Sequence, residues 1–360
     1  MNDEWLIYRG VGEPHDGIDA LPDPPPWRDF DGGPVEAPPG GSGGVGGSGG
    51  PGGPGEGAAG ASEGAIARRL GAHRQAAELH RPEPEELEAI NAALYLRRPL
   101  LVTGFPGTGK STLAHAVAHE LKLGRVLRWP VVSRTVLQDG LYRYDALARL
   151  QDVQIAASGG AWGGPGEGPG RVPGIGKYIR LGPLGTALLP ATRPRVLLVD
   201  ELDKSDIDLP NDLLNVLEEG EFALPELERV ADTEPEVQVL NDDGAKVTVR
   251  GGRVQCRAFP FIIMTSNGER DFPAALLRRC VQLKLGQPGE KRLATMVRAH
   301  LGEEAARLGA ELIREFLSRS QSELVAADQL LNAVYLTHYA APPTREDLAD
   351  LLIQRLDRPR

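Results

Sequence analysis

The feature that most limits the fold of this chain is the eight-residue stretch GFPGTGKS at residues 104–111. It matches the pattern G-x-x-x-x-G-K-[S/T], with the apolar run PLLVT just before it and the helical pattern STLAHAVAHEL at its end. Glycines let backbone N–H groups turn inward around a phosphate, and the amino end of the helix adds positive partial charge. The stretch therefore predicts a phosphate-binding loop between a buried strand and a helix.

The lysine and serine that end this stretch have separate roles in such a loop. Lys110 is placed to reach the β- and γ-phosphates of a nucleotide, and the hydroxyl of Ser111 is placed to ligate Mg²⁺. The residues expected to contact ATP are Gly104, Phe105, Pro106, Gly107, Thr108, Gly109, Lys110, Ser111 and Thr112, together with Arg345 near the carboxyl end.

A second motif supplies the acids that a metal-bound nucleotide needs. Residues 195–201, RVLLVDE, form an apolar run that ends in two carboxylates. Ligands bind at the carboxyl ends of strands in open α/β sheets. We expect Asp200 to hold Mg²⁺ through water and Glu201 to orient and deprotonate the attacking water. ATP and Mg²⁺ are the expected ligands.

Further polar positions follow in an order that suits the same chemistry. The apolar run FIIMTS ends at Asn267, which could orient the water against the γ-phosphate. In a ring of subunits, Arg278 or Arg279 could reach the adjacent site and neutralise transition-state charge. Arg345 opens a late helix and could contact the γ-phosphate. The alternatives are a solvated helix end for the arginine pair and a surface capping contact for Arg345.

Hydrophobic periodicity places these motifs in an α/β domain. Helices are expected at residues 85–96 and 111–121, and strands at 97–102, 125–132, 195–199, 259–265 and 281–285. Short apolar strands separated by helices predict a parallel sheet with helices on its faces. We divide the chain into a disordered, acidic Gly/Pro-rich tail and linker (1–64), a helical or irregular lead-in (65–84), an α/β nucleotide-binding domain (85–286) and a helical lid (287–360).

The first 64 residues differ in composition from the rest. They hold 19 of the 45 glycines, and eleven carboxylates against two arginines, so the net charge of −10 belongs almost entirely to them. Glycine loses the most entropy on ordering, which predicts a flexible linker at residues 32–64. Five residues stand out before it, either as a docking peptide or as incidental residues of a disordered tail: Trp5, Ile7, Tyr8, Trp27 and Phe30.

Composition excludes several classes of protein. The remaining residues are nearly neutral and carry no long Lys/Arg run, which does not favour nucleic-acid binding. No apolar stretch approaches the roughly 18 residues that a bilayer span requires, and the opening MNDEWLIYRG lacks the regions of a signal peptide. Cys256 and Cys280 suit a reducing compartment as ordinary buried thiols. The sequence predicts a cytoplasmic protein.

Two segments look like additions to the sheet. Residues 158–176 are glycine-rich and predict a mobile loop, whereas 237–250 alternate around Asp243-Gly244 and predict a hairpin. His115 and His119 have a spacing that can hold a metal, but no third ligand is evident nearby, which favours helix packing or solvent exposure.

The chain resembles an AAA+ ATPase, because GFPGTGKS, VLLVDE, the MTSN strand end, the PAALLRRC arginines and the TRED arginine occur in the order of that superfamily. More narrowly, it resembles the MoxR lineage over roughly residues 85–357, in INAALYLRRPLLVTGFPGTGKSTLA, DELDKSDIDLPNDLLNVLEEGEF and ADQLLNAVYL. The resemblance implies a five-stranded parallel core, a helical lid, ATP hydrolysis between subunits and a hexameric ring. It also implies that Asn267 is the first sensor, Arg279 the arginine finger and Arg345 the second sensor. Many MoxR-type chains have Asp-Arg where this chain has Arg278-Arg279, so the choice between the two arginines stays open.

The resemblance further implies a chaperone or remodelling motor with a protein client or a von Willebrand factor A-domain partner. Residues 158–176 and 237–250 would face the ring axis or the client, with ordinary surface decoration as the alternative. A hypothesis from another class is a slowly hydrolysing ATP-dependent switch or scaffold that recruits partners through its acidic tail. Glu201 argues against that hypothesis, because its loss is the simplest way to abolish hydrolysis and keep binding.

Overall fold

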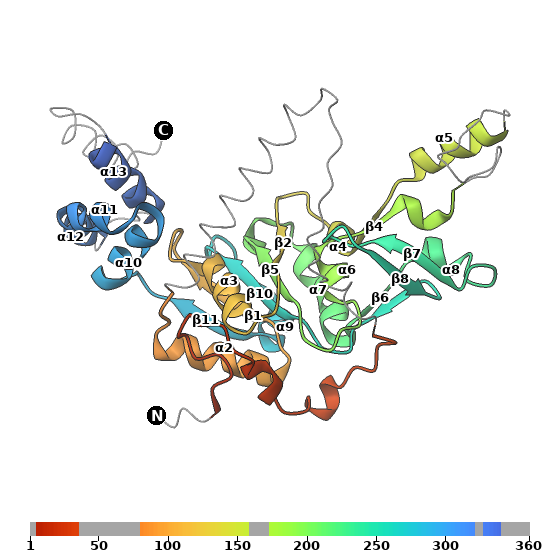
Figure 1. Cartoon of the computed structure of the whole chain (residues 1–360), viewed down its shortest axis with the longest axis horizontal. Coiled ribbons are helices and arrows are strands. Elements are labelled where there is room, and N and C mark those ends of the chain that lie inside the picture. Colours follow the sequence, from red (N-terminus) through yellow and green to blue (C-terminus); the bar gives the residue numbers. More distant parts are fainter. Residues whose placement is uncertain (1–4, 36–79, 158–172, 321–326, 340–360) are drawn as a thin grey trace, which may run out of the picture.

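The computed structural model describes residues 5–35, 80–157, 173–320 and 327–339 (Figure 1). The helices are the 3₁₀ turns Gly17–Ala20, Pro26–Arg28, Ile175–Tyr178 and Leu202–Lys204, and α2 (Pro84–Leu96), α3 (Lys110–Glu120), α4 (Leu137–Leu141), α5 (Ala146–Ala157), α6 (Pro183–Ala187), α7 (Asp208–Glu219), α8 (Pro225–Glu228), α9 (Ala274–Arg279), α10 (Glu290–Leu301), α11 (Glu303–Leu308), α12 (Ala310–Ser320) and α13 (Ala327–Tyr339). The strands are β1 (Leu100–Gly104), β2 (Leu127–Pro130), β3 (Tyr142–Tyr144), β4 (Ile179–Leu181), β5 (Val196–Asp200), β6 (Glu221–Ala223), β7 (Glu236–Leu240), β8 (Lys246–Arg250), β9 (Arg253–Gln255), β10 (Phe261–Ser266) and β11 (Val281–Leu285).

The central sheet has five strands in the order β11-β1-β10-β5-β2, and every neighbouring pair is parallel. The prediction of a parallel α/β core is confirmed. Each predicted strand is present, with ends shifted by no more than three residues. Parallel strands in one sheet place all their carboxyl ends at one edge, so the ends of β1, β5 and β10 lie together.

Alternate residues of these strands enter two different cores. Leu101, Leu197 and Met264 point to the face covered by α4, α6 and α7. Leu100, Leu198 and Ile263 point to the opposite face, which α2 and α3 cover. A strand buried on both faces needs apolar residues at every position, which explains the continuous runs LLV, VLLV and FIIM in the sequence.

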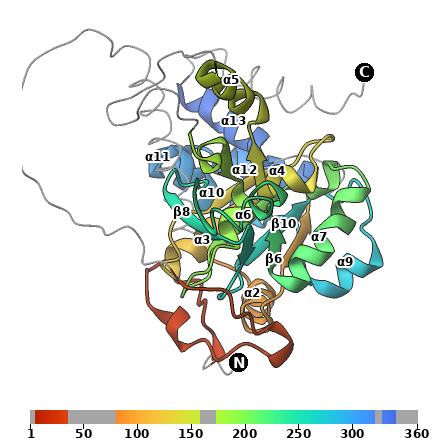
Figure 2. The same ribbon diagram turned by 90° about the vertical axis from the view of Figure 1, so that its right-hand side faces the viewer.

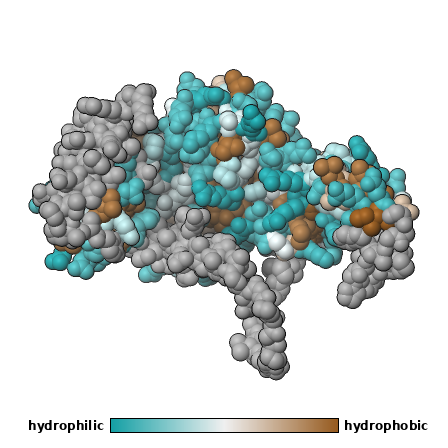
Figure 3. All heavy atoms as spheres, turned by 90° about the horizontal axis from the view of Figure 1, so that it is seen from above, coloured by the Kyte–Doolittle hydropathy of each residue, from teal (hydrophilic) through white to brown (hydrophobic). Residues whose placement is uncertain are grey.

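A second sheet of six strands, in the order β3-β4-β7-β8-β9-β6, packs beside the first. It contains the predicted hairpin, because β7 and β8 pair antiparallel around Gly244, whose φ of +81° suits a glycine. Helix α5 projects from this side with Leu147, Leu150 and Val153 exposed, and Figure 3 shows hydrophobic surface at this end of the molecule.

The C-terminal helices α10 to α13 form a separate group at the opposite side of the central sheet (Figure 1). They share a small core of their own, which includes Leu293, Ile313, Leu330 and Val334. The prediction that the chain ends in a helical part is confirmed for the described residues. Arg345 and residues 158–172 lie outside the described part of the chain, so their predicted roles are not tested.

The expectation that residues 1–64 form a disordered tail is wrong for residues 5–35, which we call the N-terminal strap. Of the residues that stood out in the sequence, Ile7, Tyr8 and Phe30 are buried, whereas Trp27 is 73% exposed. The strap crosses the outside of α2 and continues along the sheet (Figures 1 and 2). Composition alone missed this packing because a few well-placed apolar residues, not a large apolar fraction, hold the strap.

Two buried polar side chains of the domain form hydrogen bonds with backbone groups of the strap. The amide of Asn91 accepts the N–H groups of Ile7 and Tyr8 at 2.8 and 2.9 Å and donates to the Tyr8 carbonyl. The carboxylate of Glu120, the last residue of α3, accepts the N–H groups of Arg9, Gly10 and Gly12 at 2.7–3.0 Å. Buried backbone donors need such acceptors, so these contacts fix the path of the strap.

The two cysteines are free and buried, as the sequence predicts. Burial raises the pKa of Cys256 and of Cys280 to about 12, so both thiols stay protonated at neutral pH. Among the described residues, no helix has the length and apolar character to cross a membrane.

Candidate functional site

The predicted phosphate loop lies between β1 and α3, at the carboxyl edge of the central sheet. Gly107 and Gly109 have φ of +77° and +87°, and Gly109 directly precedes the first residue of α3. Residues other than glycine rarely adopt these backbone angles, so the conformation of the loop depends on the two glycines. The first N–H groups of the 11-residue helix α3 therefore face the loop, where they favour an anion.

Lys110 is held in the loop by three acceptors. Its Nζ donates to the carbonyl oxygens of Gly104 and Phe105 at 2.7 and 2.9 Å and to Oδ1 of Asn267 at 2.8 Å. Only 7% of the residue is exposed. Burial lowers the pKa of Lys110, although the nearby carboxylates of Asp203, Asp200 and Glu201 oppose that shift. The ammonium group is thus positioned at the point where phosphate oxygens would enter.

Ser111 and Asp200, the two predicted magnesium ligands, are in direct contact. The hydroxyl of Ser111 donates to Oδ1 of Asp200 at 2.8 Å, and Thr265 donates to the same oxygen at 2.8 Å. Arg128 contacts the other oxygen, Oδ2, at 2.7 Å. Burial alone would raise the pKa of Asp200, but hydrogen bonds from Arg128, Thr265 and Ser111 outweigh it and hold the pKa below its usual value. The carboxylate is therefore ionised at neutral pH.

The oxygen donors of Ser111 and Asp200 fit Mg²⁺ better than a metal held entirely by protein. Among the described residues, no group of three or more His, Cys, Asp or Glu side chains could hold a metal. Mg²⁺ commonly takes one or two protein oxygens and completes its shell with water and substrate phosphates.

Glu201, the residue directly after β5, has an unusual backbone conformation. Its φ of +62° and ψ of +48° are left-handed, which is rare for a residue with a side chain, and its N–H donates to Oγ1 of Thr265 at 2.9 Å. Strained residues of this kind concentrate at functional sites. The carboxylate is half exposed and pairs with Lys204 at 2.8 Å. Glu201 lines the same cavity, of about 390 Å³, as Lys110 and Ser111.

Hydrogen bonds hold both the side chain and the backbone of Asn267. Its side chain accepts from Lys110, and its backbone N–H donates to Oδ2 of Asp203 at 2.9 Å. The same Asp203 oxygen accepts the N–H of Glu269 at 3.1 Å. The buried carboxylate of Asp203 thus holds the loop after β10 against the end of β5, which places Asn267 in the cavity.

A second cavity, of about 370 Å³, adjoins the first on the side of the C-terminal helices. Both are lined by Gly107, Gly109, Thr112, Met296 and His300, so they form one continuous site. Arg292 of α10 spans this region, since it pairs with Glu86 of α2 and donates to the Thr108 carbonyl at 3.3 Å. The space beyond the phosphate loop suits the nucleoside part of a nucleotide.

The family model of the AAA domain, dynein-related subfamily, matches residues 99–280, which contain the phosphate loop, the acidic strand end and Asn267. The chain belongs to this AAA family. No curated protein matches the chain.

Solved structures similar to the AAA chain include NtrX from Brucella abortus in complex with ADP, at 14% sequence identity and a TM-score of 0.39. The match covers 82% of this chain and 61% of the NtrX chain, so the AAA chain spans less than two thirds of that protein. Another is PCH-2 of C. elegans, at 16% identity and a TM-score of 0.37, with 82% and 70% of the two chains covered.

The AAA domain brings most of the predicted residues to one place but not the arginine pair. Arg278 is exposed, and its carbonyl accepts from Arg98 at 3.1 Å. Arg279 pairs with Glu218 of α7 at 2.5 Å. Neither arginine lines either cavity of the candidate site.

Three contacts of the site were missed in the sequence. Arg128 gave no signal because it lies on a short edge strand with alternating burial. Thr265 lies within a continuous apolar run, where a hydroxyl is easily taken for a tolerated core residue. Asp203 could have been found, because it is the second acid after β5 and a buried carboxylate requires donors such as the Asn267 N–H.

Proposed function

We propose that this AAA domain binds ATP with Mg²⁺ and hydrolyses it. The observation that carries the proposal is the convergence of Lys110, Ser111, Asp200 and Glu201 on one cavity at the carboxyl edge of the sheet. Ser111 and Asp200 would hold Mg²⁺, which neutralises phosphate charge when bound. Asp200 is ionised and already hydrogen-bonded to Ser111, so these two side chains present oxygens that suit a cation beside the phosphate loop.

The chain's own residues suit an in-line attack by water on the γ-phosphorus. Glu201 would accept the proton of the water as the new P–O bond forms, and the bond to the β-phosphate oxygen breaks with its electron pair going to ADP. Asn267, fixed by Lys110 and Asp203, would hold the water in line. Lys110 would exchange its carbonyl partners for phosphate oxygens and neutralise charge on them.

Replacing Lys110 with alanine should weaken ATP binding by at least about tenfold, because hydrogen bonds to charged groups contribute roughly 1.5–3 kcal/mol each. Binding is measured by fluorescence titration with a labelled ATP analogue. Lys246→Ala is the matched control, because it removes an exposed lysine of β8 that lines neither cavity of the site. Its affinity for ATP should equal that of the wild type. Equal affinity in the Lys110→Ala protein would contradict the proposed phosphate site.

We further propose that the chain is a MoxR-like AAA+ ATPase that assembles into a ring, with a hexamer expected, and remodels a protein client or works with a von Willebrand factor A-domain partner. The motif resemblance supports this, and so does the position of Arg279. That arginine lies outside its own nucleotide site, on α9, and would act on the nucleotide of a neighbouring subunit as the arginine finger.

Mixing two inactive proteins tests whether Arg279 acts across an interface. Arg279→Ala subunits keep the nucleotide site and lose the finger, whereas Lys110→Ala subunits keep the finger and lose the site. Mixed rings should regain part of the wild-type phosphate release, because some interfaces then combine an intact site with an intact finger. No recovery at any ratio would contradict a role for Arg279 in a neighbouring site.

The alternative of an ATP-dependent switch that offers its acidic tail to a partner has less support. Within the described strap, Asp16 pairs with Lys122 at 2.7 Å, and Asp19 pairs with Arg193 at 2.5 Å. These acids already have partners on the same chain. We therefore favour a motor over a recruiting scaffold.

A further inference from the structure

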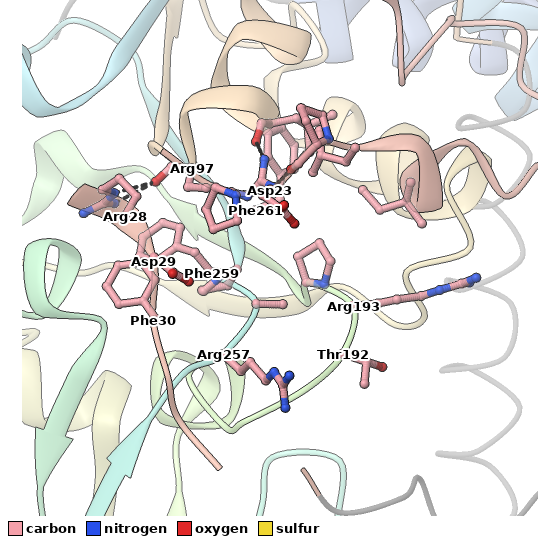
Figure 4. A pocket seen from close by; sticks show the side chains of 18 of the residues that line it. Asp23, Arg28, Asp29, Phe30, Arg97, Thr192, Arg193, Arg257, Phe259 and Phe261 are labelled. Carbon is pink, nitrogen blue, oxygen red and sulfur yellow. Dashed lines mark hydrogen bonds between the residues drawn. The ribbon is translucent and has the colours of Figure 1, made fainter. Parts of the chain in front are cut away.

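Arg28 is the buried anchor of the N-terminal strap. It is 5% exposed, and its guanidinium donates to the Arg97 carbonyl at 2.7 and 3.1 Å (Figure 4). It also donates to the Leu217 carbonyl at 2.8 Å. These carbonyls lie at the carboxyl ends of α2 and α7, where a cation is favoured. The same group lies 4.4 Å from the centre of the Phe259 ring. Arg28 thus ties the strap to the ends of two helices.

Glu218, in the last turn of α7, lies between Arg28 and Arg279. Its Oε1 is 2.5 Å from Nε of Arg279, and its Oε2 is 3.7 Å from Nη1 of Arg28. Burial lowers the pKa of Arg28, and the charge of Glu218 opposes that shift. One carboxylate therefore connects the anchor of the strap to the arginine of α9.

The contact with Glu218 constrains an otherwise mobile side chain. Arg279 is 38% exposed, and a free arginine side chain has many rotamers to lose when it contacts a ligand. Glu218 pairs with the inner nitrogen, Nε, and Nη1 donates to the Ala275 carbonyl at 3.2 Å. The guanidinium therefore has an ion-pair contact at Nε and a hydrogen bond at Nη1, which together limit its rotamers. Helices α7 and α9 lie side by side, so the pair is part of a packed contact (Figure 2).

We propose that Glu218 is a positioning residue for Arg279, and that Arg28 holds Glu218 so that docking of the N-terminal strap sets the position of the arginine. This inference rests on the proposed function, in which Arg279 acts on the nucleotide of a neighbouring subunit. Arg28 is itself fixed by backbone carbonyls, so it offers Glu218 a stationary positive charge on the side opposite Arg279. Undocking of the strap would remove that charge and loosen the arginine.

The test places Glu218→Gln in one subunit type of the mixed ring. In the parent mixture, Lys110→Ala subunits supply the finger and Arg279→Ala subunits supply the nucleotide site. Glu218→Gln added to the Lys110→Ala subunits should lower the recovered phosphate release by about tenfold, since misplacement of a catalytic group by about 1 Å can cost up to a hundredfold. The KM for ATP should not change, because ATP binds the other subunit.

Placing the same substitution in the other subunit type distinguishes a loss of Arg279 positioning from a general effect on the structure. Glu218→Gln added to the Arg279→Ala subunits, which have no finger to position, should leave the recovered rate unchanged. Arg28→Met in the Lys110→Ala subunits should lower the rate in the same direction, whereas Arg193→Ala, which removes an exposed ion pair between Asp19 of the strap and the domain, should not.

Three results would overturn the inference, and they differ in what they mean for the proposed function. Full recovery with Glu218→Gln in the finger-supplying subunits, or equal loss in both placements, would refute the positioning role and leave the proposed function standing. Failure of the parent mixture to recover any activity would refute the action of Arg279 across an interface, and the inference with it.

Discussion

Replacing Glu201 with glutamine should lower ATP hydrolysis by at least about 100-fold, because general-base catalysis contributes roughly 10²–10⁴-fold. Glutamine has almost the same shape and can still accept a hydrogen bond from Lys204, but its amide cannot take a proton from water. The contacts of Lys110 and Ser111 do not involve Glu201, so ATP binding should be retained. Steady-state phosphate release and ATP titration measure the two effects separately.

Glu234→Gln is the matched control for this substitution. It makes the same chemical change at an exposed glutamate that lines neither cavity of the site, and it should leave hydrolysis at the wild-type rate. Unchanged turnover in Glu201→Gln would show that another group activates the water.

Replacing Glu120 with alanine should release the first part of the N-terminal strap and destabilise the protein. The carboxylate is almost fully buried and is the acceptor for three backbone N–H groups, and an unsatisfied buried donor costs about 1–3 kcal/mol. We expect a loss of about 3–5 kcal/mol, limited by the free energy with which the strap docks, because an undocked strap can bond to water. Chemical denaturation measures this loss.

Hydrogen exchange tells strap release from global unfolding in the Glu120→Ala protein. The amides of Arg9, Gly10 and Gly12 should lose protection, whereas those of the central strands β1 and β10 should keep theirs. Asp16→Ala is the control, because it removes a solvent-exposed carboxylate of the same strap and should leave the unfolding midpoint near that of the wild type. Unaltered stability and unaltered protection in Glu120→Ala would contradict the anchoring role.

The central sheet could be predicted from the sequence because its strands are buried on both faces. Continuous apolar runs such as VLLV and FIIM are typical of parallel strands that are buried on both faces. The phosphate loop also fixes the order and direction of β1 and α3. The same logic places Asp200, Glu201 and Asn267 at one edge, since Asp200 ends a parallel strand and the other two directly follow one.

Other features depend on contacts between distant segments and could not be predicted. The strands of the second sheet are only three to five residues long, which is too short to show a clear periodicity outside the hairpin around Gly244. The strap looks like a disordered tail because its order depends on Asn91 and Glu120, which lie about 80 to 110 residues further along the chain. The partner of Arg128 is likewise remote, at the end of β5.

The most direct test of ATP hydrolysis at the carboxyl edge of the sheet is phosphate release by the full chain at saturating ATP and Mg²⁺, measured beside the Glu201→Gln protein with bound nucleotide quantified in both. We expect steady release by the wild type that depends on oligomer formation, and at most about one hundredth of that rate in the variant at equal occupancy. Equal rates in the two proteins, or bound ATP that the wild type does not hydrolyse, would contradict it.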